Sequence, residues 1–255
     1  MKKKAVAVVM TAVMALGMVS AVSVQAGIED KTLIVGFDAE YPPYGYMDEN
    51  GEYTGFDLEL AQAVCDLEGW ELEKKPINWD SKDMELNSGS IDCIWNGFTM
   101  NGREDDYTFS EPYVDNSQVI VVADDSGIEK LTDLAGKTVG VQAASAALDL
   151  LQSEEEGGQK ELADTFGALN EFADYNTAFT ELQAGALDAL AIDVGVAKYQ
   201  LNSRGEGFKI LDETLNTEQY AIGFKKGNQE LCDIVNADLQ LSLIHISEPT
   251  RRRGI

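Results

Sequence analysis

Two stretches of the chain, LNSGSIDCI at residues 86–94 and LQAGALDAL at residues 182–190, follow one pattern 96 positions apart. Each contains a Leu, a Gly three residues later, and then an aliphatic residue, an Asp and another aliphatic residue. This order is typical of a helix end, a Gly that breaks the helix, and a short apolar strand. A repeat at such long spacing predicts two lobes built on one plan rather than a short-period solenoid. A chance match of small and aliphatic residues is the alternative.

The segments around the repeats alternate between strand and helix patterns. In the first lobe, strands are predicted at residues 32–36, 72–77 and 91–95, with a loop at 38–45 and helices that start at Phe56 and Trp79. The second lobe repeats the alternation, with strands at 138–141 and 187–192 and a helix over 143–151. This order predicts an α/β fold in which each lobe has a mostly parallel sheet flanked by helices.

Two further β-rich runs predict crossings between the lobes, at residues 118–122 and 220–224. Two crossings make the first lobe discontinuous, with residues 27–116 and 221–240, and leave residues 117–220 to the second lobe. Lobes joined in this way can hinge and close around a ligand, so we expect a clamshell with two hinge strands.

The amino-terminal segment has the pattern of a secretory signal peptide. Three lysines at residues 2–4 precede an apolar run to about Val22, and Val24-Gln25-Ala26 offers small residues for cleavage near Ala26. We therefore exclude residues 1–26 from the fold and expect an extracytoplasmic protein. A membrane anchor is the alternative reading.

The other end, LSLIHISEPTR at residues 241–251, matches the translation of a transposase sequencing adapter. It has no period that continues the preceding pattern, so we expect the native chain to end near Gln240 and residues 241–255 to be an artefactual tail. A real basic tail is the alternative. The only His, His245, lies in this tail, so catalysis or metal binding through His is not expected.

The formal net charge of −26 excludes most nucleic-acid and anionic-membrane partners and favours a cationic or zwitterionic ligand. Cys65, Cys93 and Cys232 lack metal-ligand spacing, and we expect buried free thiols, with a Cys65–Cys93 bridge as the alternative. Neither a metal nor a cofactor is predicted.

Polar residues follow both repeat strands, where ligands bind in α/β sheets. A free amino acid presents a carboxylate and an ammonium group. Arg103 can bind the carboxylate through two parallel hydrogen bonds, and Asp193 can pair with the ammonium from the opposite lobe. The alternatives are a surface ion pair of Arg103 within its charged run at 104–106, and a helix cap for Asp193.

Other groups at these strand ends can complete the site. Thr99 offers a backbone N–H and a hydroxyl, Gly97 a carbonyl, and the helix that opens at Ser145 further N–H groups. Ser145 is more often a helix cap. The aromatic residues Tyr41 and Trp79 lie in expected loops and can form the walls, although core packing is their usual role.

With these residues in place, the chain resembles the extracytoplasmic solute-binding proteins of polar amino-acid ABC transporters, a family that includes glutamine-, histidine- and lysine/arginine-binding proteins. The resemblance covers nearly all of residues 27–240 and is carried by FDAEYPPY at 37–44, GFDLELA at 55–61, IDCIWNGFT at 91–99 leading to Arg103, FSEPY at 109–113, LAGKTVGVQ at 134–142 and residues 185–193.

The resemblance implies roles for individual residues. Arg103, Thr99 and the Ser145 amide would bind the ligand carboxylate, and Gly97 and Asp193 the ammonium. The walls would be Tyr41 and Trp79, with Asp38, Asn96 and Gln142 near the variable end of the ligand. The chain departs from the family in two ways: the segment from Thr99 to Arg103 is one residue shorter than usual, and the final helical segment that returns to the first lobe is missing if the tail is foreign.

The implied function is the binding of an L-amino acid with a polar or cationic side chain and its delivery to an ABC transporter permease. A monomer without catalytic residues is expected. An exported dehydratase similar to cyclohexadienyl dehydratase, which uses the same scaffold, and a ligand-sensing domain are the alternatives.

Overall fold

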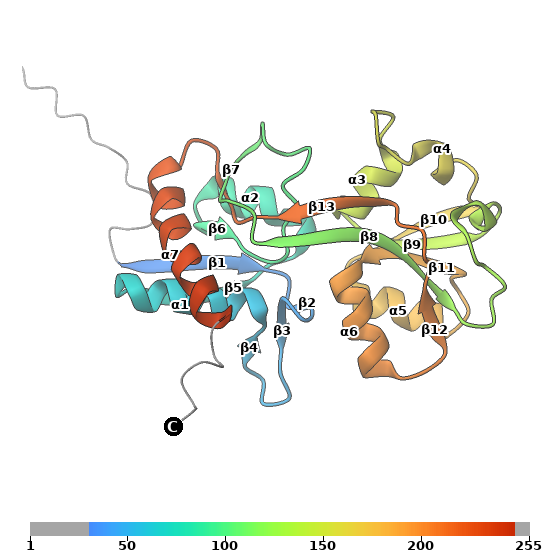
Figure 1. Ribbon diagram of the computed structural model, residues 1–255, viewed down its shortest axis with the longest axis horizontal. Helices are drawn as coiled ribbons and strands as arrows, with labels where there is room; N and C mark the ends of the chain where they lie inside the picture. Colours follow the sequence, from blue (N-terminus) through green and yellow to red (C-terminus); the bar gives the residue numbers. More distant parts are fainter. Residues whose placement is uncertain (1–30, 248–255) are drawn as a thin grey trace, which may run out of the picture.

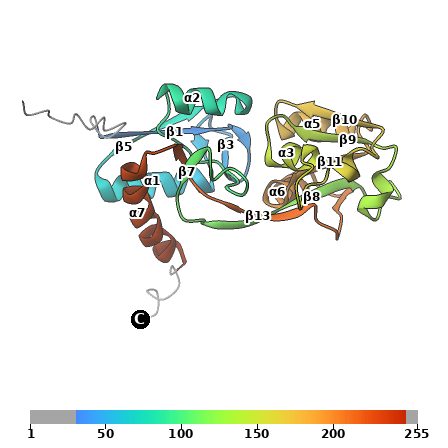
Figure 2. The ribbon, with the colours of Figure 1, turned by 90° about the horizontal axis from the view of Figure 1, so that it is seen from above.

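The computed structural model describes residues 31–247, with side chains as far as Leu241, as two lobes joined by two long strands (Figure 1; Figure 2). The expected signal segment at residues 1–26 and residues 248–255 of the tail lie outside the described residues. Within the described range, no helix is both long and apolar enough to cross a membrane.

The first lobe is built on a five-stranded mixed sheet. Its order is β5 (Glu71–Pro76), β1 (Thr32–Phe37), β6 (Cys93–Ile94), β14 (Gly223–Lys225) and β7 (Tyr107–Phe109). Strand β1 is parallel to β5 and β6, whereas β14 is antiparallel to β6 and β7. A parallel trio is thus extended by antiparallel strands, one of which comes from a distant part of the chain.

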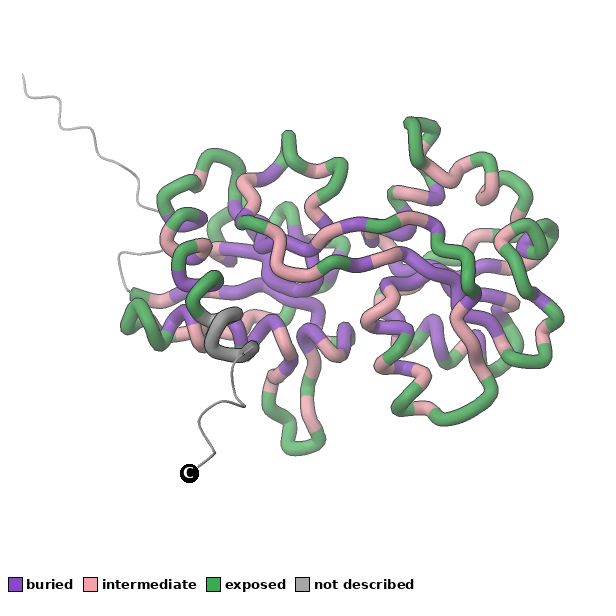
Figure 3. Tube along the Cα trace, viewed as in Figure 1, coloured by how far each residue is buried: buried purple, intermediate pink, exposed green. Residues whose placement is uncertain are grey.

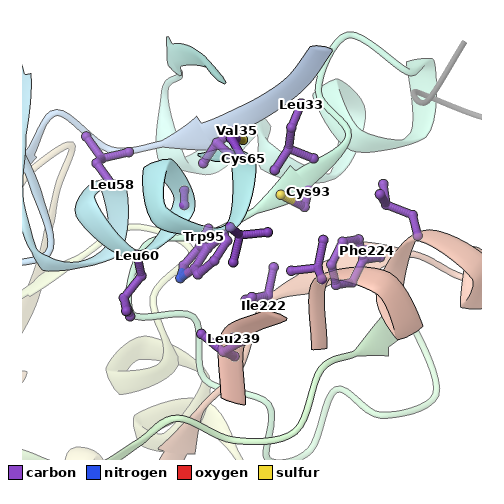
Figure 4. Packing of buried hydrophobic residues seen from close by; sticks show 14 of the residues in the cluster. Leu33, Val35, Leu58, Leu60, Cys65, Cys93, Trp95, Ile222, Phe224 and Leu239 are labelled. Atoms are coloured by element: carbon purple, nitrogen blue, oxygen red, sulfur yellow. The ribbon is translucent and has the colours of Figure 1, made fainter. Parts of the chain in front are cut away.

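Helices cover both faces of this sheet. On one face lie α1 (Phe56–Glu68) and α7 (Gln229–Ser247), and on the other lies α2 (Lys82–Ser88). A 3₁₀ turn, η1 (Trp79–Ser81), leads into α2. Figure 4 shows the core under α1 and α7, where Leu58 and Leu239 pack around the fully buried Trp95. The apolar spacing predicted from Phe56 onward therefore forms the buried side of α1.

A small hairpin sheet stands beside the first lobe, with strands β2 (Glu40–Tyr41), β3 (Gly45–Met47) and β4 (Tyr53–Thr54). The prediction of a plain loop at residues 38–45 is wrong here, because the Pro pair forms the turn between β2 and β3, which are antiparallel.

The second lobe repeats the parallel trio in a six-stranded sheet. Its order is β10 (Ala168–Phe172), β9 (Thr138–Gln142), β11 (Ala189–Asp193), β8 (Val114–Ala123) and β12 (Phe208–Ile210), with β13 (Asn216–Tyr220) also paired to β8. Helices α5 (Tyr175–Gln183) and α6 (Val194–Arg204) pack on one face. The other face is covered by η2 (Leu131–Leu134) and α3 (Ala146–Gln152), with α4 (Lys160–Ala163) beside α3.

The two repeats occupy equivalent places. Gly89 after α2 and Gly185 after α5 have φ of 78° and 74°, a left-handed conformation that Gly adopts without steric cost. The carboxylate of Asp92 accepts a 2.8 Å hydrogen bond from the Ile34 N–H in β1, and Asp188 accepts one of the same length from Thr138 in β9. The repeated Asp therefore ties each repeat strand to the central strand of its trio.

The chain crosses between the lobes along β8 and β13, which pair antiparallel from Asn216 opposite Gln118 to Tyr220 opposite Val114. The predicted crossing at residues 220–224 is wrong in its position: the paired strand ends at Tyr220, and Phe224 already belongs to the first lobe. The apolar alternation at 220–224 marks entry into that core, whereas the crossing itself has a polar sequence. Figure 3 shows buried residues gathered in a core within each lobe.

Helix α7 corrects one expectation about the end of the chain, that the tail has no period continuing the preceding pattern. It runs without a break from Gln229 through Gln240 to Ser247, so the start of the adapter-like tail continues a helix. The part of α7 before Gln240 packs on the first lobe, where its Leu231, Val235 and Leu239 are buried.

Replacing Leu239 by Ala is expected to lower the free energy of unfolding by about 2–5 kcal/mol, because it leaves a cavity between α7 and the sheet. Denaturant unfolding measures this change. The control is Leu67→Ala on α1, where the side chain is 55% exposed and the change should stay within about 0.5 kcal/mol. Equal effects of the two substitutions would contradict the burial of α7.

All three cysteines are buried in the first lobe and none is bonded to another, so the Cys65–Cys93 bridge is not formed. Burial raises the pKa of Cys65 and of Cys232 to about 11. These thiols therefore stay protonated at neutral pH and behave as small apolar side chains.

Candidate functional site

A small cavity lies between the lobes. Nine of the ten predicted site residues line it, together with Ala146: Tyr41, Trp79, Asn96, Gly97, Thr99, Arg103, Gln142, Ser145 and Asp193. The tenth, Asp38, lies directly behind the lining and accepts a 2.7 Å hydrogen bond from Gln142 Nε2. Both lobes contribute through the segments that follow the carboxyl ends of their parallel strands.

The guanidinium of Arg103 reaches the cavity from the turn after β6. Its side chain is 13% exposed, lies 5.0 Å over the Phe98 ring, and donates from Nη1 to the Thr99 carbonyl at 3.3 Å. Its ion pair is with Asp149 of α3 in the other lobe, at 2.6 Å, and not within the charged run at 104–106. Asp149 was not predicted, although its position four residues after the predicted helix cap places it on the first turn.

The carboxylate of Asp193 is 4% exposed and is fixed by side chains of the hinge strands. Its Oδ1 accepts hydrogen bonds from Gln118 Nε2 at 2.6 Å, the Tyr220 hydroxyl at 2.6 Å and Asn116 Nδ2 at 2.9 Å. Asp193 precedes α6, but its side chain makes no capping hydrogen bond. The structure thus disfavours the helix-cap alternative.

Thr99 uses its hydroxyl differently from the prediction. Thr99 Oγ1 donates to Glu218 Oε1 at 2.9 Å, so this proton is not directed at the cavity. Asn116 Nδ2 and Gln118 Nε2 donate to the same Glu218 oxygen at 2.7 and 2.8 Å. Glu218 was not predicted, and the only signal for it is a charged residue inside a run that pairs as a strand.

Asp38, Asn96 and Gln142 form a hydrogen-bonded group at one end of the cavity. Asn96 Oδ1 accepts from the Asp38 N–H at 2.7 Å, and the Asp38 carboxylate in turn accepts from Gln142 of the other lobe. Burial raises the pKa of Asp38 to about 6. Asn96 Nδ2 is buried and has no hydrogen-bond partner among the described residues.

Aromatic rings and a glycine shape the rest of the lining. Trp79 packs edge-on against Phe98. The hydroxyl oxygens of Tyr41 and Tyr220 are 3.4 Å apart. Gly97 has a φ of 54°, and a Cβ there would come within 2.9 Å of the Tyr220 ring. Any larger residue at position 97 would therefore be strained and would displace the aromatic lining.

Ser145 caps α3, as its alternative reading expected. Its hydroxyl accepts from the Leu148 N–H at 3.2 Å and donates to the Gln142 carbonyl at 2.7 Å.

Several contacts hold the lobes together around the cavity. Besides Arg103–Asp149 and Gln142–Asp38, the Lys82 ammonium donates to the Ala144 carbonyl at 3.1 Å, and Asn176 donates to Glu40. The structure is therefore a closed form. Among residues 31–247, no group of His, Cys, Asp and Glu side chains is arranged to hold a metal.

Comparison with known proteins agrees with this geometry. Residues 33–242 match the model of the bacterial extracellular solute-binding proteins, family 3. The chain belongs to this family. The match covers both lobes and both crossings, and it confirms the resemblance seen in the motifs.

One relative of this chain is the arginine-binding extracellular protein ArtP of Bacillus subtilis. It is 35% identical over 82% of this chain and 80% of its own length. The L-cystine-binding protein TcyJ of Escherichia coli is 29% identical over 88% and 85%.

Solved structures show the same fold. A substrate-binding protein of an ABC uptake transporter from Streptococcus pneumoniae, with bound histidine, has a TM-score of 0.77 and 33% identity over 83% of this chain and 86% of its own. An ancestral arginine-binding protein bound to arginine has a TM-score of 0.75 and 37% identity over 86% and 97%. The two-lobed clamshell is thus confirmed.

Proposed function

We propose that this protein binds a free L-amino acid with a polar or cationic side chain outside the cytoplasm and delivers it to the permease of an ABC transporter. The observation that carries the proposal is that Arg103 and Asp193, of opposite charge and from different lobes, line one buried cavity. A zwitterion whose ends contact both lobes stabilises the closed form, because only differential affinity shifts such an equilibrium.

The assignment of groups follows from the lining. The ligand carboxylate takes the place next to Arg103, with backbone N–H groups of Thr99 and Ser145. The ammonium lies between the Gly97 carbonyl and Asp193. Tyr41 and Trp79 enclose the ligand, whose side chain extends toward Asp38, Asn96 and Gln142. The Asp38 carboxylate at that end favours a ligand side chain with a guanidinium, ammonium or amide group.

The names of four relatives agree with a polar or basic ligand, since they specify arginine, cystine, histidine and glutamine. All are binding proteins, which supports a role without catalysis. We further propose that the protein acts as a monomer and that the signal segment is cleaved near Ala26.

A thermal-shift screen of the twenty L-amino acids and L-cystine tests the proposal. A ligand at a hundred times its dissociation constant adds about 2.7 kcal/mol, which raises Tm by roughly 5–10 °C in a chain of this size. We expect this shift for one or more polar or basic L-amino acids and none for their D-enantiomers. No shift with any compound would refute the proposal, and turnover of prephenate or arogenate would establish the dehydratase alternative instead.

A further inference from the structure

Two buried carboxylates, Asp193 and Glu218, share the same hydrogen-bond donors in the hinge. Asn116 Nδ2 donates to both, at 2.9 and 2.7 Å, and Gln118 Nε2 donates to both, at 2.6 and 2.8 Å. Each amide nitrogen carries two protons, so one is available for each carboxylate. The two acids are therefore held close together, each 4% exposed.

No Lys or Arg within the described part of the chain neutralises this pair. Among the described residues, neither Asp193 nor Glu218 forms an ion pair with Lys or Arg. Glu218 Oε2 is buried and has no hydrogen-bond partner in the described part of the chain. Two adjacent carboxylates in such a place cannot both stay charged without a counterion, so one of them holds a proton or a cation arrives from outside.

We propose that Glu218 is a positioning residue for the ammonium end of the ligand, and that in mildly acidic solution it holds a proton in the empty protein that it releases to solvent when the ligand binds. This inference rests on the proposed function, because the ligand ammonium supplies the charge that replaces the proton. Asp193 contacts the ammonium directly, whereas Glu218 acts from behind Thr99 and the two amides. Burial, followed by the charge of Asp193, raises the pKa of Glu218 to about 6.

The other charged and titratable groups around Glu218 do not replace it in this role. They include the hydroxyls of Tyr44, Tyr175 and Tyr220. Along a cavity that Glu218 also lines they include the cations Arg103 and Lys82 and the acids Asp83, Asp106, Asp149, Glu155 and Glu156. Burial raises the pKa of each tyrosine, so all three stay neutral near pH 6. The charge of Arg103 is offset by Asp149 at 2.6 Å.

The sign of the pH dependence follows from linkage. Below about pH 6 the empty protein holds the proton and the ligand must displace it, so affinity falls as the pH falls. The pKa of Glu218 is raised to about 6 in the empty protein, and the ligand ammonium lowers it in the complex. Binding at pH 5 should therefore be weaker than at pH 7.5 by up to about tenfold. Roughly half a proton per ligand should be released at pH 6.

The experiment is titration calorimetry of the full chain with the amino acid identified by the screen, from pH 5 to pH 7.5. At pH 6 it is repeated in buffers of different ionisation enthalpy, which gives the number of protons released. The variant is Glu218→Gln, which keeps the acceptor for Thr99 and removes the charge. We expect its pH profile to flatten, its proton release to vanish, and its affinity at pH 7.5 to fall by about tenfold.

Asp38 is the matched control, because burial also raises its pKa to about 6 but it lies at the other end of the cavity. Proton release that survives Glu218→Gln and vanishes in Asp38→Asn would overturn the inference and assign the proton to Asp38. A flat profile without proton release in the unaltered protein would overturn it even if the Gln variant did not fold. Absence of binding at pH 7.5 would instead refute the proposed function, and this inference with it.

Discussion

Arg103→Ala is expected to abolish measurable binding of the amino acid, with an affinity loss of about 1,000-fold, or about 4 kcal/mol. The guanidinium is the positive group of the cavity lining, and it is 13% exposed. Removing the Arg103 side chain leaves the ligand carboxylate in a largely enclosed site without a cation. Titration calorimetry at pH 7.5 measures the loss.

Two further variants make this test specific. Arg103→Lys keeps the charge but not the two parallel hydrogen bonds, so its affinity should lie between those of the unaltered protein and the Ala variant. Lys209→Ala breaks an exposed ion pair with Glu129 on the second lobe and should leave affinity unchanged. If Arg103→Ala bound as tightly as Lys209→Ala, the carboxylate would have to be held elsewhere.

Asp193→Ala is expected to weaken binding by at least about a hundredfold, because the ligand ammonium then loses its direct counterion. It should also destabilise the protein by about 1–3 kcal/mol, since Asn116, Gln118 and Tyr220 are left with one acceptor fewer. Asp193→Asn keeps the shape and an acceptor oxygen, so it should lose affinity with a smaller loss of stability.

Asp188 provides the control for Asp193, which follows it by five residues and lies just after the repeat. It binds the Thr138 N–H at the start of β9 and does not line the cavity. Asp188→Asn should therefore lower the unfolding free energy without changing affinity. Calorimetry and denaturant unfolding of both variants separate the two roles. Equal affinities for the two Asn variants would rule out an ammonium site at Asp193.

The repeat and its flanking patterns were enough to predict the two-lobed fold. The Gly has a local cause, a left-handed residue after a helix, and local causes can be recognised in a sequence. The Asp binds a strand N–H 58 or 50 residues away, and it stood out only because it recurs in both lobes. The return crossing was misplaced because β13 has a polar sequence. Its burial comes from pairing with β8, which sequence periodicity does not show.

The same contrast holds for the candidate site. Residues at strand ends, such as Arg103 and Asp193, could be selected because the carboxyl edge of a parallel sheet is a general ligand site. Glu218 and Asp149 could not, because their partners are far away in the sequence: Glu218 bonds to Thr99, and Asp149 to Arg103. Side-chain contacts between the lobes depend on how the lobes close, and no local pattern encodes that.

The place of β14 in its sheet also fixes an order of assembly. Residues 223–225 insert between β6 and β7, two strands that precede them by more than a hundred positions. The facing edges of β6 and β7 therefore remain unpaired until residues 223–225 have been synthesised and exported. The strands at 114–220 already hold all the partners of their own sheet by then. The second lobe can thus fold first, whereas the sheet of the first lobe is complete only when β14 is added.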